Sequence, residues 1–174
     1  MTSSYDLFRK LDRRPLGKQA FSVGFMLKAP YFATVRPWVL DMRPHRGEVK
    51  IRKRRSVQNH IGTVHAIAVA NGMEAAMGLL AEATTPRGMR WIPKGIRLDY
   101  LAKVTTDVRC VAETDPADWD QEPPFEVQVR CTGIIDDGSE VVRGTIPIWV
   151  TAKSSSKGAS PTASSAQEKV PATA

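Results

Sequence analysis

The sequence predicts an α+β fold in which an antiparallel sheet wraps around one long central helix, with two short helices before it. Three observations predict this fold. One long, almost wholly apolar segment lies near the middle of the chain, and segments with strand-like alternation mostly follow it. The chain has 174 residues, of which 42% are hydrophobic, and this suits one globular domain with a substantial core.

Two helices are predicted at the start of the chain. Residues 4–14 place apolar side chains at helical spacing among basic ones, and residues 18–28 form a second, more apolar segment that ends before Pro30. Basic helices of this kind can lie on a membrane surface or cap a domain. Capping is the commoner role, and we expect it here.

Two strands joined by a turn are predicted next, at residues 34–44 and 47–57. In the second strand the alternation continues through the basic run "KIRKRR" (residues 50–55) and predicts one partly buried and one solvated face. The same run matches a nucleic-acid-binding patch. Such patches interleave aromatic with basic residues, and this run has no aromatic, so we do not expect a nucleic-acid partner.

Four more strands are predicted after the central helix, at residues 95–104, 106–114, 124–135 and 140–151. Residues 84–95 are rich in Pro and Gly and are predicted to form a loop, whereas Asp137–Gly138 predicts a hairpin turn. Pro147 lacks a backbone donor, which predicts that the last strand lies at a sheet edge or bulges at that point.

Composition divides the chain into N-terminal helices (1–29), a sheet-and-helix domain (30–151) and a tail (152–174). The tail is dominated by Ser, Ala, Thr and Pro, and it cannot bury enough apolar surface to offset the entropy of ordering, so it is predicted to be disordered. No apolar run suits a transmembrane span, and the first residues lack the pattern of a secretory signal. We therefore expect a cytoplasmic location.

Charge indicates which classes of partner are plausible, and the two cysteines indicate the redox compartment. The formal net charge of +7 favours anionic ones, such as nucleic acid, an anionic membrane surface or a phosphate-bearing small molecule like coenzyme A. Cys110 and Cys131 lie far apart in strand-like segments without the spacing of a metal site. We expect two buried free thiols in a cytosolic protein, and we expect no zinc site.

The central helix is predicted at residues 59–80, "NHIGTVHAIAVANGMEAAMGLL", where many Ala and Gly residues would let strands approach the helix axis closely. Glu74 is the single carboxylate in this stretch. Burial of an isolated carboxylate is costly, so Glu74 should be paired, border a water-lined pocket or take part in chemistry. The other interpretation is that Glu74 faces a subunit interface or solvent.

The first residues of this stretch are polar or flexible. Thr63 is predicted as the N-cap, which would leave the N–H groups of Val64, His65 and Ala66 without intrahelical partners. A helix N-terminus with free N–H groups binds an anion or a developing oxyanion. The segment therefore offers donors at its start and a carboxylate about three turns along, as an attack on a carbonyl requires.

These residues resemble a known family. Asn59 is followed six positions on by His65, with Gly62 between them, and Glu74 comes nine positions after His65. The pattern resembles the acyl-CoA thioesterases of the hotdog fold, above all the phenylacetic-acid-pathway branch with its Asn, His-Gly-Gly and acidic residue. Together, "NHIGTVHAIAVAN" and "GMRWIPKGIRLDYLAK" look like an uncharacterised bacterial hotdog family, and the resemblance covers residues 30–151.

The resemblance implies a homodimer, often paired into a tetramer, with active sites at the subunit interface. Glu74 of one protomer would be the general base or nucleophile. Asn59 of the other, with the Gly62 loop, would position the thioester or the water. Backbone N–H groups near Ala66 and Ile67 would stabilise the oxyanion.

Where the family has His-Gly-Gly, this chain has His65, Ala66 and Ile67. The branched Ile67 side chain can crowd the oxyanion site, which leaves open a non-catalytic acyl-CoA or lipid-binding module. His65 can be catalytic or can simply bond a neighbouring carbonyl. A hotdog dehydratase is a weaker alternative: His60 lies fourteen positions before Glu74, as such enzymes require, but their proline between the two is missing.

Arg87, Arg90 and Lys94 lie in a basic loop beside an aromatic residue. They can hold the phosphates and adenine of coenzyme A, or they can form a solvated loop. The substrate is thus expected to be a thioester of coenzyme A or of an acyl carrier, and no cofactor is expected.

Overall fold

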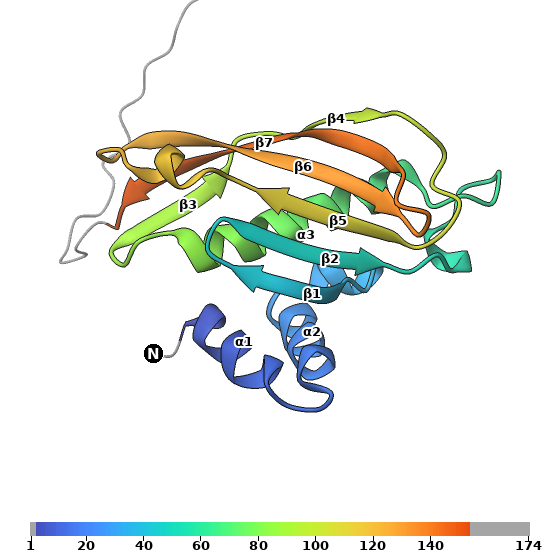
Figure 1. Cartoon of the computed structure of the whole chain (residues 1–174), viewed down its shortest axis with the longest axis horizontal. Helices are drawn as coiled ribbons and strands as arrows, with labels where there is room; N and C mark the ends of the chain where they lie inside the picture. Colours follow the sequence, from blue (N-terminus) through green and yellow to red (C-terminus); the bar gives the residue numbers. More distant parts are fainter. Residues whose placement is uncertain (1–2, 154–174) are drawn as a thin grey trace, which may run out of the picture.

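A curved antiparallel sheet of seven strands wraps around one long helix in the computed structural model, which describes residues 3–153 (Figure 1). This arrangement confirms the α+β hotdog fold. The elements are α1 (Ser4–Asp12), α2 (Gly17–Lys28), η1 (Pro30–Thr34), β1 (Trp38–Arg43), β2 (Arg46–Ile51), η2 (Arg55–Val57), α3 (Ala66–Thr84), β3 (Met89–Pro93), β4 (Arg97–Tyr100), β5 (Val108–Glu113), η3 (Pro116–Trp119), β6 (Phe125–Ile135) and β7 (Glu140–Ala152).

The sheet follows the order β1-β2-β5-β6-β7-β3, with β4 pairing with β7 on the same side as β3. The turn between β6 and β7 has the expected tip, where Gly138 adopts a φ of +88° that favours glycine. The tail beyond residue 153 lies outside the described residues.

Pro147 is not in an edge strand, because β7 has β6 on one side and both β3 and β4 on the other. β4 pairs with β7 up to Thr145 and β3 pairs from Ile148 onwards, so Pro147 falls in the gap between them. Its carbonyl still accepts a hydrogen bond from the Lys94 N–H, 2.8 Å away. The missing donor therefore costs nothing, since no strand faces it there.

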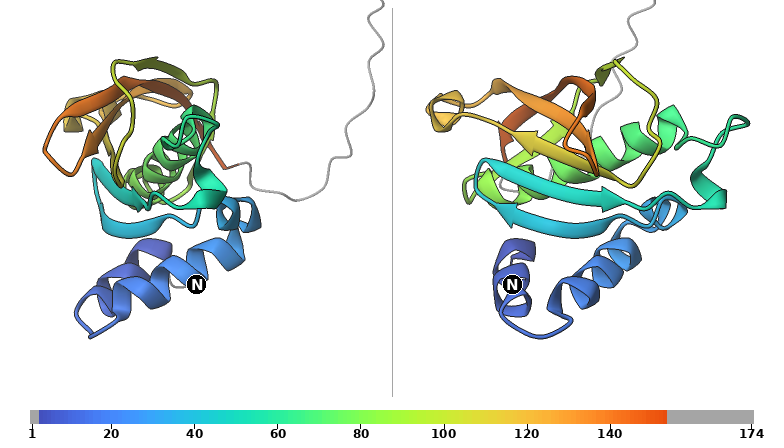
Figure 2. Two further views of the ribbon diagram at one scale, coloured as in Figure 1. Left: turned by 90° about the vertical axis from the view of Figure 1, so that its right-hand side faces the viewer. Right: turned by 45° about the vertical axis from the view of Figure 1, so that its right-hand side comes forward.

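Both N-terminal helices form as expected and lie against the β1 end of the sheet (Figure 2). Ser3 caps α1, and Phe8 packs edge-on against Phe21 of α2 with ring centroids 5.0 Å apart. Ser22 is buried in α2 and accepts a hydrogen bond from the Val39 N–H of β1 at 2.9 Å. The two helices are thus fixed to each other and to the sheet.

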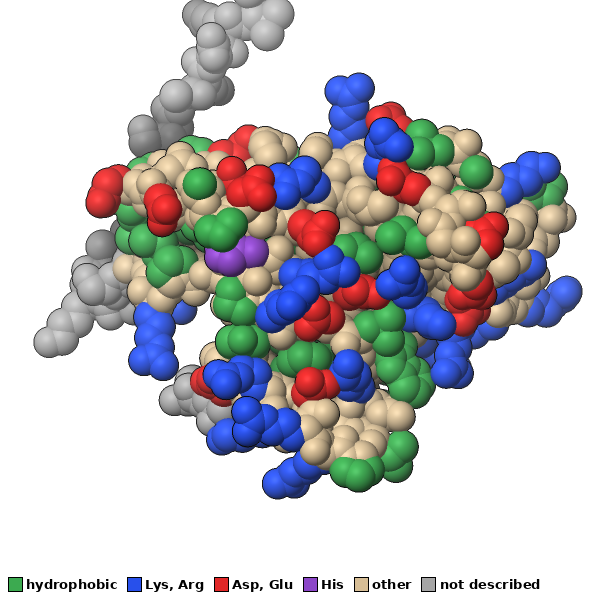
Figure 3. Space-filling model, viewed as in Figure 1, with side chains coloured by type: hydrophobic (Ala, Val, Ile, Leu, Met, Phe, Trp, Pro, Cys, Tyr) green, Lys and Arg blue, Asp and Glu red, His purple; other side chains and the backbone are tan. Residues whose placement is uncertain are grey.

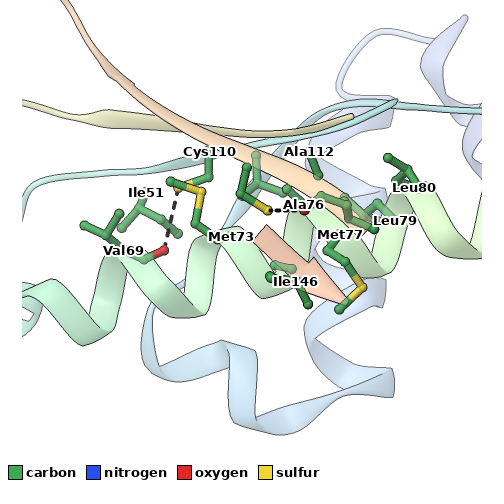
Figure 4. Close-up of a cluster of buried hydrophobic side chains, with 14 of the residues drawn as sticks. Ile51, Val69, Met73, Ala76, Met77, Leu79, Leu80, Cys110, Ala112 and Ile146 are labelled. Atoms are coloured by element: carbon green, nitrogen blue, oxygen red, sulfur yellow. Dashed lines mark hydrogen bonds between the residues drawn. The ribbon is translucent and has the colours of Figure 1, made fainter. Parts of the chain in front are cut away.

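The face of α3 turned toward the sheet holds Val69, Met73, Ala76 and Leu80, and we call it the sheet-covered face (Figure 4). Gly72 lies beside it, and a Cβ there would stand 2.7 Å from the Cys110 sulfur. On the strand side, a Cβ on Gly47 of β2 would stand 2.1 Å from the Ala76 carbonyl oxygen. Strands and helix therefore meet at backbone distance, as the small residues predicted.

Two further predictions about the strands were wrong. The second strand ends at Ile51 rather than Val57, because the basic run after it bonds to loops: the Arg54 guanidinium donates to the Val35 carbonyl at 3.0 Å. The expected loop at residues 84–95 contains β3, which pairs with β7 along its whole length. Its bounding Pro and Gly residues hid this strand.

Cys110 and Cys131 are free and buried, which confirms the expectation about the thiols. Burial raises the pKa of both groups, that of Cys131 to about 12, so neither thiol is poised as a nucleophile. Within residues 3–153, no helix is long and apolar enough to cross a membrane.

Candidate active site

One face of α3 is not covered by the sheet. It consists of Ile67, Ala70, Glu74, Gly78 and Glu82, which recur every three or four residues, and we call it the open face. Ile67 is 61% exposed, and Glu74 is exposed as well. Glu74 has no ion pair or hydrogen bond within residues 3–153. The Glu74 side chain therefore faces outward in this protomer and is not buried among apolar residues.

Two pockets meet at Glu74. The first has a cavity volume of about 400 Å³ and lies between the N-terminal helices and the open face. The second, of about 350 Å³, is formed with Pro93, Lys94, Gly95 and Ile96 after β3. In Figure 3 the surface is hollowed between the N-terminal helices, at the bottom, and the rest of the domain. The carboxylate thus borders both spaces.

α3 starts at Ala66, later than expected, and its N-cap is His65 rather than Thr63. His65 Nδ1 accepts a hydrogen bond from the Ile67 N–H at 3.1 Å. The Val64 N–H donates to the Val104 carbonyl, and the His65 N–H to the Val57 carbonyl. Of the donors expected to be free, only the Ala66 N–H lacks a partner among the described residues.

Asn59 lies in the loop before α3, not in the helix. Its Oδ1 accepts from the Thr63 N–H at 3.1 Å and from the Ile61 N–H at 3.2 Å, while Nδ2 donates to the Thr63 hydroxyl at 2.9 Å. Gly62 has a φ of +79°, which favours glycine. Asn59 and Gly62 therefore shape a tight polar turn, and the exposed His60 lies at its surface.

Sequence reasoning missed two residues at the first turns of α3. The Tyr100 hydroxyl of β4 donates to the Ala66 carbonyl at 3.0 Å, and partial burial raises the pKa of Tyr100. Asn71 is buried, and its Oδ1 has no hydrogen-bond partner within residues 3–153. It lines a third pocket, of about 220 Å³, together with His65 and Ile67. The sequence signal that could have identified Asn71 is a polar Asn within an otherwise apolar part of the helix.

The three basic residues expected near the substrate are separated. Lys94 shares a pocket with Glu74, and its ammonium lies 5.8 Å from the Trp149 ring centroid. Arg90 lies on β3 and donates to the Thr151 hydroxyl at 3.2 Å. Arg87 is exposed in the turn before β3. Neither arginine lines a described pocket with Glu74. Within residues 3–153, no three His, Cys, Asp or Glu residues are grouped as a metal site.

Solved structures of known proteins share this fold. A structural-genomics crystal structure is 39% identical, with a TM-score of 0.75, and the match covers 86% of this chain and 98% of that one. A thioesterase family protein from Silicibacter pomeroyi is 16% identical, with a TM-score of 0.63, covering 76% and 96% of the two chains. A phenylacetic acid degradation protein from Thermus thermophilus is 18% identical, with a TM-score of 0.58, covering 69% and 97%.

A search of curated proteins finds no match. The family described as a domain of unknown function, DUF4442, matches residues 17–150, which include α2 and the whole sheet except the last two residues of β7. The chain has the hotdog fold and belongs to this family of unknown function.

Proposed function

We propose that the protein hydrolyses acyl thioesters of coenzyme A or of an acyl carrier, with Glu74 as the acting carboxylate. The observation that carries this proposal is the position of Glu74 at the junction of two pockets on the open face of α3. A thioester has an acyl part and a thiol part on either side of its carbonyl. Two spaces that meet at one carboxylate suit such a substrate.

Glu74 would act in one of two ways. As a general base, it takes a proton from water while the water oxygen attacks the thioester carbonyl. As a nucleophile, it forms a mixed anhydride that water then hydrolyses. In both cases the carbon–sulfur bond breaks, the thiol leaves with a proton, and a carboxylic acid is the second product. The free Ala66 N–H is the donor best placed at the start of α3 to stabilise the oxyanion.

A helix rises about 1.5 Å per residue, so Ala66 and Glu74 of one protomer are about 12 Å apart along α3. One carbonyl cannot contact both, and we infer that the donor and the carboxylate of each site come from two protomers. Exposed apolar residues support a homodimer: Ile67 on α3, Ile92 on the edge strand β3 and Ile96 after it. Asn59 would accompany the donor by holding the loop before α3.

The test is hydrolysis of acyl-CoA thioesters, followed by release of free thiol. Wild-type protein should turn over at least one substrate. A mixture of Glu74→Gln and Asn59→Ala protomers, refolded together, should recover about a quarter of wild-type turnover, because half the dimers are mixed and each has one intact site. If wild type is active but the refolded mixture recovers no turnover, Glu74 and Asn59 of one site belong to the same protomer.

A binding module without catalysis is the second candidate, and one contact favours it. The Ile67 N–H, the second expected oxyanion donor, is occupied by His65 Nδ1. The module would bind acyl-CoA tightly and release no thiol, and Glu74→Gln would then leave binding within about twofold of wild type. The two free, buried thiols suit a reducing compartment, so we also propose a cytoplasmic location.

A further inference from the structure

We propose that α1 and α2 form one wall of a pocket for a linear aliphatic acyl chain, and that the substrates are therefore medium- or long-chain acyl thioesters. This inference rests on the proposed hydrolase function, since it names the substrate class of the same site. The pocket in question is the one of about 400 Å³ beside Glu74. Its size lies within the usual range for ligand pockets, roughly 300 to 1,000 Å³.

The pocket is built from both parts of the chain. The N-terminal helices contribute Leu7, Leu11, Phe21 and Phe25, and the hotdog domain closes the other side with residues that include Met77 and Trp91. Phe21 packs against Phe8, and Phe25 stacks on Phe32 with centroids 5.0 Å apart. Aromatic rings fixed in this way make a firm wall rather than a loose cover.

Two glycines leave the pocket open. Gly24 of α2 and Gly78 of α3 both line it. A Cβ on Gly24 would meet nothing within 4 Å, and one on Gly78 would come no closer than 3.7 Å to the Trp91 ring. Each glycine weakens its helix by about 1 kcal/mol relative to alanine. Space at these positions is what the chain gains in return.

Polar groups are few in this pocket. The lining includes Ser4, Lys28, Glu74 and Glu82, and the first two hydrogen-bond each other at 3.1 Å. A sugar or a nucleotide would lose hydrogen bonds with water on entering and find few replacements. A hydrocarbon chain loses none and gains from burial of its surface. The lining therefore selects an aliphatic chain, with its carboxyl end at Glu74.

The second pocket gives the direction of the substrate. It adjoins Glu74 from the side of Lys94, a cation that suits a phosphate-bearing thiol carrier. The acyl chain would thus extend under α1 and α2, the carbonyl would lie at Glu74, and the thiol would leave toward Lys94. The N-terminal helices then determine which chain lengths fit.

The test compares Gly78→Leu and Gly24→Leu, which fill the pocket, with the matched control Val23→Leu, whose side chain lies on the exposed side of α2 outside the lining. We measure kcat/KM for butanoyl-, octanoyl-, dodecanoyl- and hexadecanoyl-CoA. Wild type should prefer a longer chain to butanoyl. The dodecanoyl-to-butanoyl ratio should fall by roughly tenfold in each filled variant, which corresponds to lost contact with about two methylene groups. The control should keep the ratio within about twofold.

An unchanged ratio in both filled variants, with turnover intact, would overturn the acyl pocket and leave the hydrolase standing. If wild type hydrolyses no thioester, the hydrolase proposal fails. Calorimetric binding of dodecanoyl-CoA then tests separately whether the pocket binds an acyl chain. Binding that Gly78→Leu weakens by roughly tenfold would then support the pocket. No binding, or equal binding by both proteins, would overturn it.

Discussion

The two faces of α3 differ in their residues and in their surroundings. The sheet-covered face consists of Val69, Met73, Ala76 and Leu80, which are buried by strands of the same chain. The open face mixes the apolar Ile67 and Ala70 with Glu74, Gly78 and Glu82, and within the described protomer it is bordered by pockets and by solvent. Stability explains the first face fully. The second carries exposed apolar surface and two carboxylates, Glu74 and Glu82, that stability does not require, and this difference is why we propose it as the functional face.

The strongest way to test this comparison is to place the same charge on each face. Leu80→Asp should prevent folding, because an unpaired carboxylate would be buried where wild type has 0% exposure. Ile67→Asp should fold, since residue 67 is exposed and an acidic residue near a helix N-terminus is favourable. Circular dichroism and sedimentation check both. We expect the Ile67→Asp protein to be a folded monomer; a folded dimer would show that the open face is not the interface.

A methyl group on the strand side tests how tightly the sheet-covered face is packed. Gly47→Ala should cost about 3 kcal/mol or more in the free energy of unfolding, because the new Cβ would clash with the backbone of Ala76 and Leu80. Gly95→Ala is the matched control, since its Cβ would meet nothing within 4 Å, and it should change stability by less than about 0.5 kcal/mol. Urea unfolding measures both. Equal stabilities would mean that the sheet does not approach α3 so closely.

The cap of α3 separates a structural from a chemical role of His65. His65→Ala should lower the free energy of unfolding by about 1 kcal/mol, because the Ile67 N–H loses its acceptor. His65→Asn should restore stability, since Asn is a good N-cap. We expect thioester turnover to fall in His65→Ala and to return in His65→Asn, in parallel with stability. A stable but inactive Asn variant would instead assign a chemical step to the imidazole.

The smallest expected effect concerns α1, a wall of the proposed acyl pocket. Hydrogen bonds with the Ser3 side chain and backbone lower the pKa of Asp6 below its ordinary value of 3.8. A lowered folded-state pKa means that this stabilisation is present above 3.8 and is lost as the pH falls through the folded value. The urea midpoint should therefore fall less in acid for Asp6→Asn than for wild type. Identical acid profiles would show that this cap does not hold α1.

The sequence predicted the fold well because the signals for it are local. Alternation located β5, β6 and β7, and Asp137–Gly138 located the hairpin between β6 and β7. Prediction from the sequence failed where tertiary contacts overrode the local pattern. β3 pairs with β7 despite its bounding prolines, and the basic run after Ile51 bonds to loops instead of continuing a strand.

The candidate site was predicted in part. The spacing of Asn59, His65 and Glu74 located the residues but could not show which backbone donors are already bonded, because Val64 and His65 donate to distant segments. The open face could not be recognised from the sequence, because α3 carries Ala and Gly residues on every side. The pocket under α1 and α2 depends on packing between segments far apart in the chain, which no local pattern reports.

The most direct test of the central claim, that the open face of α3 carries the chemistry, is hydrolysis of acyl-CoA thioesters by Glu74→Gln. Glu122→Gln, an exposed loop substitution away from both pockets, is the matched control. We predict that Glu74→Gln lowers kcat by about 10²- to 10⁴-fold, as expected for loss of a general base, while the control retains full turnover. Wild-type turnover that survives in Glu74→Gln would contradict the claim and place the chemistry elsewhere.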